Sequence, residues 1–365
     1  MYWERFIDDK KQGDAPDSRD GIYFIPASSD DEIPTIVGQS HHYETMAFSG
    51  FITESIDLKN FSIRPGVRLE LFEQERVDRL SGSTYLDKTT SVVLPGIGFI
   101  GDISGLNLFG GVHRGFTPPS SGALKILNFG ENVESGGLDL KAEKSWNKEI
   151  GLRGKISFVD FEFSGYHVSI EDLVAAGRGT AFKNLGKVST MGIETRTSLG
   201  LSNLNKFLPN IDVTYSFLYT EVIEGEIISN VSGSVGSQVS IEGKELPYAP
   251  THTLLAGIYK DFGDKASIRL DVKYVSEVYT DFENIKRTDN IGIQGPVPEY
   301  AILNLSTNYK FNEKTHLYLS GKNITDESYI GSRLHSNPGQ KEAGLSSGII
   351  IGPRRQINIG LEHNF

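Results

Sequence analysis

The sequence predicts an all-β fold, an antiparallel up-and-down sheet of the transmembrane β-barrel type. Three observations predict it: apolar and polar residues alternate in many segments, no long window has helical periodicity, and short and long connections alternate along the chain. A period of two places successive side chains on opposite faces of a strand. Short turns on one side and longer loops on the other are typical of outer-membrane barrels, whereas a soluble sandwich usually has short connections on both sides.

Composition narrows the class of protein. The 365 residues contain no apolar run of about 18 residues, the length that a transmembrane helix needs. A net charge of -11 disfavours a nucleic-acid partner, because neutralising phosphates requires clustered Lys and Arg. The 40 glycines suit a chain with many tight turns, and the lack of cysteine is compatible with the bacterial envelope.

The chain begins with residues 1–6, which we interpret as the end of a strand, and continues with a long segment, 7–42. That segment is rich in Asp, Ser, Pro and Gly and is predicted to be mostly an extracellular loop. Strands joined in pairs by tight turns follow. The expected pairs are 43–57 with 61–77, 91–103 with 106–116, 142–154 with 157–171, 184–201 with 210–224, 251–262 with 266–280, and 299–311 with 315–327.

Longer polar segments separate these pairs. They are 78–90, 117–141, 172–183, 225–250, 281–298 and 328–353. The last strand, 354–365, has Ile357, Ile359 and Leu361 on one face, ends on Phe365, and is expected to pair with 315–327. Together the segments give about fourteen strands, including the doubtful first one, with almost no helix.

Two enzyme-like motifs lack the structural context that they require. Residues 96–101 match the dinucleotide fingerprint GxGxxG, but a strand rather than a helix is expected to follow. Residues 344–348 match the nucleophile elbow GxSxG, which also needs a following helix. No spacing indicates a metal site. We therefore expect no metal and no cofactor.

Basic residues near the outer ends of strands are the candidate ligand-binding group. Such residues could line a mouth that attracts an anionic, oxygen-rich ligand, because Arg binds carboxylates through two hydrogen bonds. The alternative is ordinary solvated charge or contact with lipopolysaccharide. The candidates are His113, Arg114, Arg178, Arg287 and Arg333.

Short motifs spread over nearly the whole chain carry a family resemblance. They include RPGVR at 64–68, VHRGFTPP at 112–119, EKSWNKEIG at 143–151 and KNITDESY at 322–329. Further matching stretches are 94–98, 184–186 with 192–194, 247–252, and 353–355 with the terminal Phe365. In this order they resemble the C-terminal part of the β-barrel of TonB-dependent outer-membrane receptors, most closely the ferric-dicitrate and ferric-siderophore group.

The resemblance implies that residues 1–365 form one receptor-like barrel domain in the outer membrane of a Gram-negative bacterium. Receptors of this family have a signal peptide, a TonB-binding motif, a plug domain and a barrel of about 22 strands. The chain lacks the first three and is therefore expected to be part of such a barrel. The implied partners are a ferric chelate, outer-membrane lipid and lipopolysaccharide, and the TonB–ExbB–ExbD system through the missing plug, with the receptor a monomer.

Two other classes of protein remain open at this stage. A passive porin or fatty-acid-type channel would close by itself as a smaller barrel of about fourteen strands. A soluble β-rich adhesin or enzyme would purify without detergent, although the sided strands and alternating connection lengths disfavour it. The identity of the carried chelate depends on loop residues, which the strand motifs do not determine.

Overall fold

A computed structural model describes residues 2–12, 25–26, 34–35, 39–78, 82–119, 140–175, 183–229, 231, 234, 236–334 and 348–365. Its main feature is one large antiparallel sheet whose strands are hydrogen-bonded in chain order. Fourteen strands form the continuous path of this sheet. They are β1 (Tyr2–Gln12), β4 (Gln39–Thr53), β6 (Phe61–Asp78), β7 (Thr84–Ile103), β8 (Leu106–Thr117), β9 (Glu143–Ile156), β10 (Val159–Glu171), β13 (Gly186–Leu199), β14 (Asn210–Ile228), β16 (His252–Phe262), β17 (Ala266–Val275), β18 (Tyr300–Asn312), β19 (Thr315–Lys322) and β22 (Gln356–His363).

Short strands accompany the main sheet. β5 (Ile56–Leu58) pairs with β6, and β15 (Gln238–Ser240) pairs with β14. Three small two-stranded pairs lie apart from the path, namely β2 (Ile25–Pro26) with β3 (Pro34–Thr35), β11 (Val174–Ala175) with β12 (Lys183–Asn184), and β20 (Ile330–Arg333) with β21 (Ile349–Ile351). The described residues contain a single short 3-10 helix, Leu201–Asn203, and none of their helices is long and apolar enough to span a bilayer.

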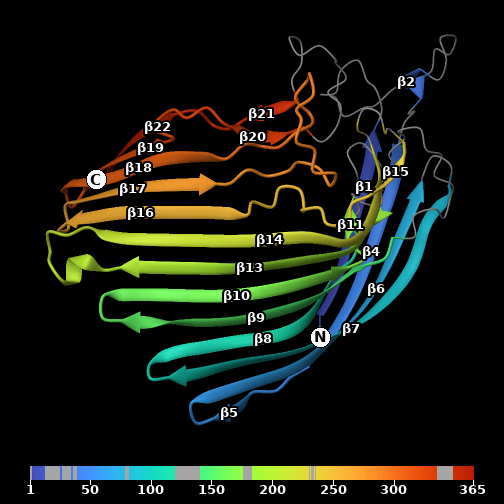
Figure 1. Cartoon of the computed structure of the whole chain (residues 1–365), viewed down its shortest axis with the longest axis horizontal. Helices are drawn as coiled ribbons and strands as arrows, with labels where there is room; N and C mark the ends of the chain where they lie inside the picture. Colours follow the sequence, from blue (N-terminus) through green and yellow to red (C-terminus); the bar gives the residue numbers. More distant parts are fainter. Residues whose placement is uncertain are drawn as a thin grey trace.

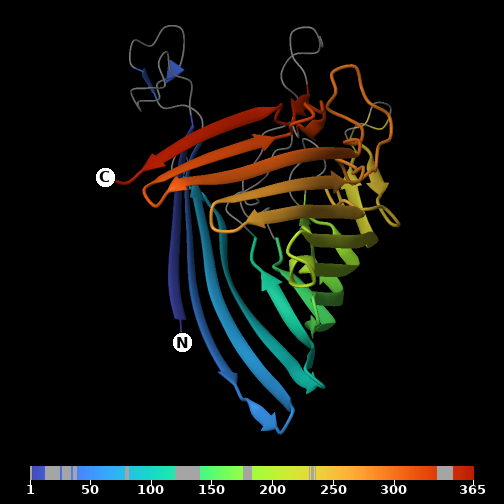
Figure 2. The ribbon, with the colours of Figure 1, turned by 90° about the vertical axis from the view of Figure 1, so that its left-hand side faces the viewer.

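The sheet curves strongly and its tight turns lie together at one end. Figures 1 and 2 show the strands bending round an open lumen, with the turns at one end and the long connections at the other. The path is open in the described part of the chain: β1 pairs only with β4, and β22 only with β19. These observations confirm the predicted all-β antiparallel architecture, the count of fourteen strands and the pairing of the last strand.

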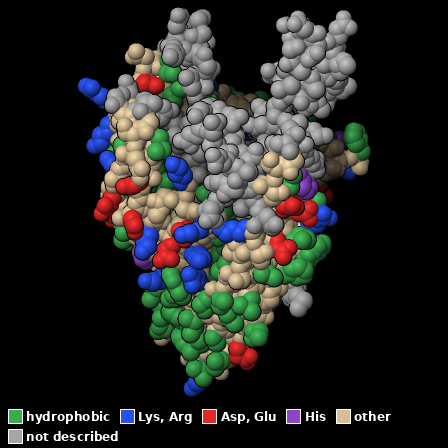
Figure 3. All heavy atoms as spheres, turned by 90° about the vertical axis from the view of Figure 1, so that its right-hand side faces the viewer, with side chains coloured by type: hydrophobic (Ala, Val, Ile, Leu, Met, Phe, Trp, Pro, Cys, Tyr) green, Lys and Arg blue, Asp and Glu red, His purple; other side chains and the backbone are tan. Residues whose placement is uncertain are grey.

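The two faces of the sheet differ in chemistry. In β9, Ile150 and Leu152 point to one face, whereas Glu149 and Arg153 point to the other. Ile150 pairs across the strands with Gly165 and then Ile193 on the same face, and both isoleucines are exposed to the surroundings. We call these the apolar face and the polar face. Figure 3 shows hydrophobic side chains gathered over the lower part of the molecule in that view, below a zone of charged residues.

Some predicted connections are shorter than expected. β1 extends to Gln12 and β4 begins at Gln39, so the first long connection is 13–38 rather than 7–42. β7 begins at Thr84, within the segment 78–90 that was interpreted as a loop. The reason is strand pairing. Residues Thr84–Thr90 continue the ladder with Phe72–Val77 of β6, and the cross-strand contacts stabilise this polar segment as a strand.

The strand predicted at 315–327 ends at Lys322, because the residues that follow leave the strand and form hydrogen bonds outside the ladder. Asn323 and Asp326 both have a positive φ, which ordinary strand pairing does not permit. Asn323 is only 2 % exposed, and its amide binds the carbonyls of Glu327 (2.8 Å) and Pro353 (3.1 Å). Strand pairing resumes beyond the break, in β20 and β21.

Candidate functional site

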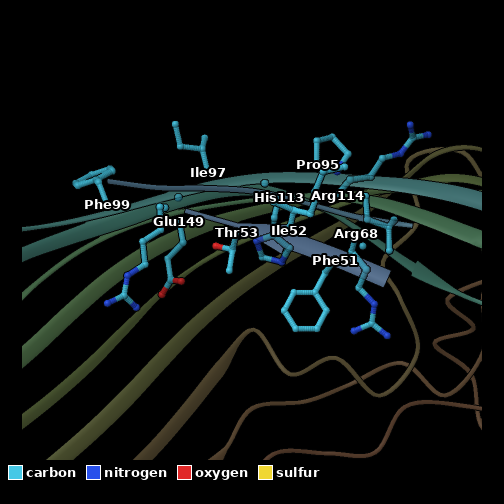
Figure 4. A pocket seen from close by; sticks show the side chains of 18 of the residues that line it. Phe51, Ile52, Thr53, Arg68, Pro95, Ile97, Phe99, His113, Arg114 and Glu149 are labelled. Carbon is cyan, nitrogen blue, oxygen red and sulfur yellow. The ribbon is translucent and has the colours of Figure 1, made fainter. Parts of the chain in front are cut away.

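An open groove of about 1120 Å³ lies along β4 and β6–β9. Its polar-face lining includes Arg64, Arg68, Glu70, His113 and Glu149. Alternation along each strand explains this set: Arg64, Arg68 and Glu70 are even-numbered residues of β6, and the odd-numbered Val67 and Leu69 point the other way. Figure 4 shows Arg68, His113 and Glu149 pointing to one side of the strands, and Pro95, Ile97 and Phe99 to the other.

The charges of this groove are only partly neutralised. Arg68 forms an ion pair with Glu70, whose side chain is almost buried, and donates a hydrogen bond to Ser49 (3.4 Å). Among the described residues, neither Arg64 nor His113 forms an ion pair or a side-chain hydrogen bond. Arg64 is exposed and its charge is not paired with a carboxylate, so it can contribute positive potential to the lumen. His113 adds an exposed imidazole that can form hydrogen bonds.

Glycines leave the wall of the groove bare. The cross-strand register places Gly66 beside Gly96, and Gly98 beside Gly111, on the polar face. A Cβ at Gly98 would find its nearest heavy atom 3.7 Å away, the carbonyl oxygen of Gly110, so the chain itself does not fill that space. Backbone N–H and C=O groups are consequently within reach of whatever occupies the lumen.

A second charged row lies on the polar face nearer the tight turns. Arg269 of β17 binds Asp212 of β14 (2.9 Å) and Asp271 of its own strand (2.8 Å). Ser198 donates a hydrogen bond to Asp212 (2.7 Å), and Tyr259 lies beneath the guanidinium, 5.5 Å from its ring centre. This row is internally neutralised, so it stabilises the wall rather than attracting a free anion.

The connections beyond β14–β18 form a packed block. Arg333 is 5 % exposed and donates hydrogen bonds to the carbonyls of Gly292 (2.6 Å) and Pro296 (2.9 and 3.1 Å). Asn284 is bound to the backbone of Glu245 in both directions (2.8 and 2.9 Å). A small apolar core lies below them, made of Leu185, Val188, Val222, Ile227 and Ile241.

The predicted site residues do not form one cluster. His113 and Arg114 are neighbours in β8, and their side chains point to opposite faces, His113 into the groove and Arg114 beside Trp146. Arg287 is exposed in the connection between β17 and β18. Arg333 does not face a mouth, because its guanidinium is buried on backbone carbonyls. Arg178 lies outside the described residues.

The groove residues Arg64, Arg68 and Glu149 were not among the sequence candidates. Their signal is present in the alternation itself, because a polar residue between two apolar ones in a membrane strand faces the lumen. The sequence candidates were instead chosen for their position near strand ends. Loop position alone does not show which way a side chain points.

The structure describes one of the two enzyme-like motifs in full, and a strand follows that motif, as the sequence predicted. Residues 96–101 lie within β7 and lead by a tight turn into β8, so the helix of a dinucleotide site is missing there. Of the second motif only Gly348 is described, and Ser346 lies outside the described residues. The described part of the chain contains no group of three or more His, Cys, Asp or Glu that could hold a metal ion.

Comparison with known proteins gives one family and a set of similar folds. A model of the family "TonB dependent receptor-like, beta-barrel" matches residues 3–324. The unliganded ferric citrate transporter FecA aligns with a TM-score of 0.70 and 19% identity, covering 92% of this chain and 48% of that one. The ferric-catecholate import receptor Fiu from E. coli K12 aligns with a TM-score of 0.66 and 16% identity, covering 91% and 46%.

A third similar structure is the siderophore receptor PiuA from Acinetobacter baumannii, with a TM-score of 0.66 and 15% identity. It covers 88% of this chain and 43% of that one. The present chain therefore spans about half the length of these solved structures. At such low identity the structural likeness shows the fold, and the family match extends over most of the sheet.

Proposed function

The chain belongs to the TonB-dependent receptor-like β-barrel family, and from this premise we propose that it is the barrel part of a receptor that imports a ferric chelate. The family is one of outer-membrane receptors and transporters. The proposed ligand is a ferric dicitrate or a ferric siderophore, the classes named for the similar solved structures FecA, Fiu and PiuA.

The observation that carries this proposal is the polar-face groove with the unpaired guanidinium of Arg64 on its wall. Arg64 and His113 lie on the wall of the lumen, and the bare backbone at Gly98 leaves room beside them. An oxygen-rich ferric chelate with net negative charge would be attracted by such a surface. In this proposal Arg287 contributes at the outer opening, whereas Arg333 holds the outer block in place.

Energy for import would come from the TonB–ExbB–ExbD system acting through a plug within the lumen. No covalent chemistry is needed, so the proposed role requires no catalytic residue. The ordered block above β14–β18 would form a fixed side of the mouth, because its connections are fastened to one another by Arg333 and Asn284.

Uptake of iron-55 supplied as ferric citrate or as a siderophore tests the proposal. Cells of the source bacterium that lack this gene should lose uptake of one chelate, and loss of TonB should have the same effect. Uptake that persists without TonB, together with steady conductance of the refolded chain in planar bilayers, would contradict it and favour a passive channel.

A further inference from the structure

The apolar face contains a second groove, of about 870 Å³, that crosses the sheet from β6 to β14. Its walls are almost entirely apolar and are lined by Ile97, Val112, Ile150, Met191, Ile193 and Phe217. Strand pairing places Ile150, Gly165, Ile193 and Phe217 in one row on this face. The groove therefore opens away from the lumen, toward the surroundings of the barrel.

The floor of this groove is empty because of a glycine. A Cβ built on Gly165 would have no heavy atom nearer than the carbonyl oxygen of Gly192, at 3.9 Å. Two strands away, in β8, the corresponding position at Gly110 is covered by the carbonyl oxygen of Glu149 at 2.7 Å and by ring atoms of Phe99 at 2.9 Å. The protein fills the hollow over Gly110 but leaves the hollow over Gly165 open.

Two cations, Lys148 and Arg114, lie at one end of the groove, near His167, whose ring is hydrogen-bonded with Ser189 (3.0 Å). The next row of the same face, two residues along each strand toward the long connections, contains Lys148 and its cross-strand partner His167. One row farther, Arg114 is paired with Trp146, and its guanidinium lies 5.8 Å from that ring. Each such row is displaced by about 7 Å along the strand, the rise of two residues.

Lys148 and Arg114 can each still bind an anion. Within the described part of the chain Lys148 forms neither an ion pair nor a side-chain hydrogen bond, and the Nε of Arg114 is buried without a hydrogen-bond acceptor. Beyond them on this face, Glu171 stands between Lys144 and Lys187. Glu221, in the Trp146 row, already accepts a hydrogen bond from Tyr219. Positive charge is therefore in excess directly above the apolar groove.

We propose that this groove is a binding site for one lipid with a phosphate-bearing, anionic headgroup. One acyl chain lies over Gly165 between Ile150 and Ile193, and the phosphate contacts Lys148 and Arg114 beside His167. The order of apolar and cationic rows matches the order of tail and headgroup in such a lipid. The inference rests on the proposed placement of the barrel in a membrane and concerns a face that ligand import does not use.

Trp146 provides a reporter next to the proposed headgroup site. The chain has two tryptophans, so the variant Trp3→Phe leaves Trp146 as the only one. This protein is refolded into phosphatidylcholine vesicles that contain increasing fractions of dibrominated phosphatidylglycerol or dibrominated phosphatidylcholine. Quenching of Trp146 should reach half its maximum at a mole fraction about fivefold lower for the anionic lipid, and high salt should reduce this preference.

Two variants and one matched control distinguish lipid binding at this site from general electrostatic attraction of anionic lipid to the protein. Lys148→Gln should remove the about fivefold preference, whereas Lys265→Gln, the same charge change in the exposed turn between β16 and β17, should leave it intact. Gly165→Leu should lower quenching by the anionic lipid because its Cβ meets no atom nearer than 3.9 Å and the rest of its side chain occupies the hollow.

The outcomes distinguish the site from the membrane placement. Equal quenching by both brominated lipids, or equal effects of Lys148→Gln and Lys265→Gln, would overturn the lipid site and leave the placement intact. A lack of quenching by either lipid, with no heat-modifiable mobility on gels, would overturn the membrane placement and the site with it.

Discussion

At the scale of single residues, buried polar side chains determine where the regular sheet is interrupted. Asn323 accepts a hydrogen bond from the N–H of Glu327 (2.9 Å), and its own N–H is bound by Asn304 (3.0 Å). Asp326 binds Arg354 through both carboxylate oxygens (3.0 and 2.7 Å). The break after β19 is thus fastened to the segment before β22, which joins the last two strands outside their ladder.

Asn323→Ala should destabilise the sheet by about 2 kcal/mol, because it removes a buried side chain whose part-buried hydrogen bonds hold the backbone of Glu327 and Pro353. The midpoint of urea unfolding of the refolded chain in detergent micelles measures this. Asn358→Ala is the control, since Asn358 is exposed and makes a weak hydrogen bond to Ser320 (3.3 Å). Equal shifts of the midpoint for the two variants would contradict the role assigned to Asn323.

Arg333→Gln should loosen the outer block without unfolding the strands. It removes the donors that bind the carbonyls of Gly292 and Pro296, so the connection 276–299 should exchange its amide hydrogens faster and be cut sooner by protease. Arg287→Gln is the matched control because Arg287 is exposed in the same connection. Unchanged exchange in the Arg333 variant would show that the block is held by its apolar core instead.

At the scale of elements, the packing of β8 on β9 depends on a glycine beneath an aromatic ring. A Cβ at Gly151 would lie 2.3 Å from the ring of Phe109, so Gly151→Ala must displace that ring and should cost about 1–3 kcal/mol. Gly98→Ala meets only ordinary contacts and should be neutral or slightly stabilising. Unfolding midpoints compare the two, and a loss of stability in Gly98→Ala would indicate that its backbone cannot accept a side chain.

Elements also show what the sequence predicts and what it does not. The strand 143–156 was predicted as 142–154, and the strand 266–275 was predicted as 266–280, with the right start and five residues too many at its end. In both, apolar and polar residues alternate and a tight turn lies at one end. The break at Asn323 was missed, since it depends on hydrogen bonds to residues of two other segments. The burial of Arg333 was missed for the same reason: its acceptors lie about forty positions away in the sequence, and no local pattern reveals them.

At the scale of the whole molecule, the sheet has two edges, β1 and β22, that are not paired with each other in the described structure. Unpaired backbone groups are costly in hydrocarbon, so each edge needs a neighbour when the barrel lies in a membrane. The apolar residues of β22, including Ile359, are among the most exposed of the sheet. The apolar side chains of β22 are therefore suited to contact with lipid, whereas the backbone N–H and C=O groups along its free edge still need a partner.

Cysteine pairs introduced into this cysteine-free chain test whether the sheet closes by itself. Ser320→Cys with Asn358→Cys should form a disulfide within one molecule, because these residues are cross-strand partners in β19 and β22. Asn358→Cys combined in turn with Glu4→Cys, Phe6→Cys or Asp8→Cys, all on the same face of β1, should remain reduced in the refolded monomer. A disulfide within one molecule between β1 and β22 would show closure as a barrel of fourteen strands and would favour the passive channel. Disulfides between molecules would show instead that the two edges pair in trans, which is the behaviour expected of edges that are complete only with further strands.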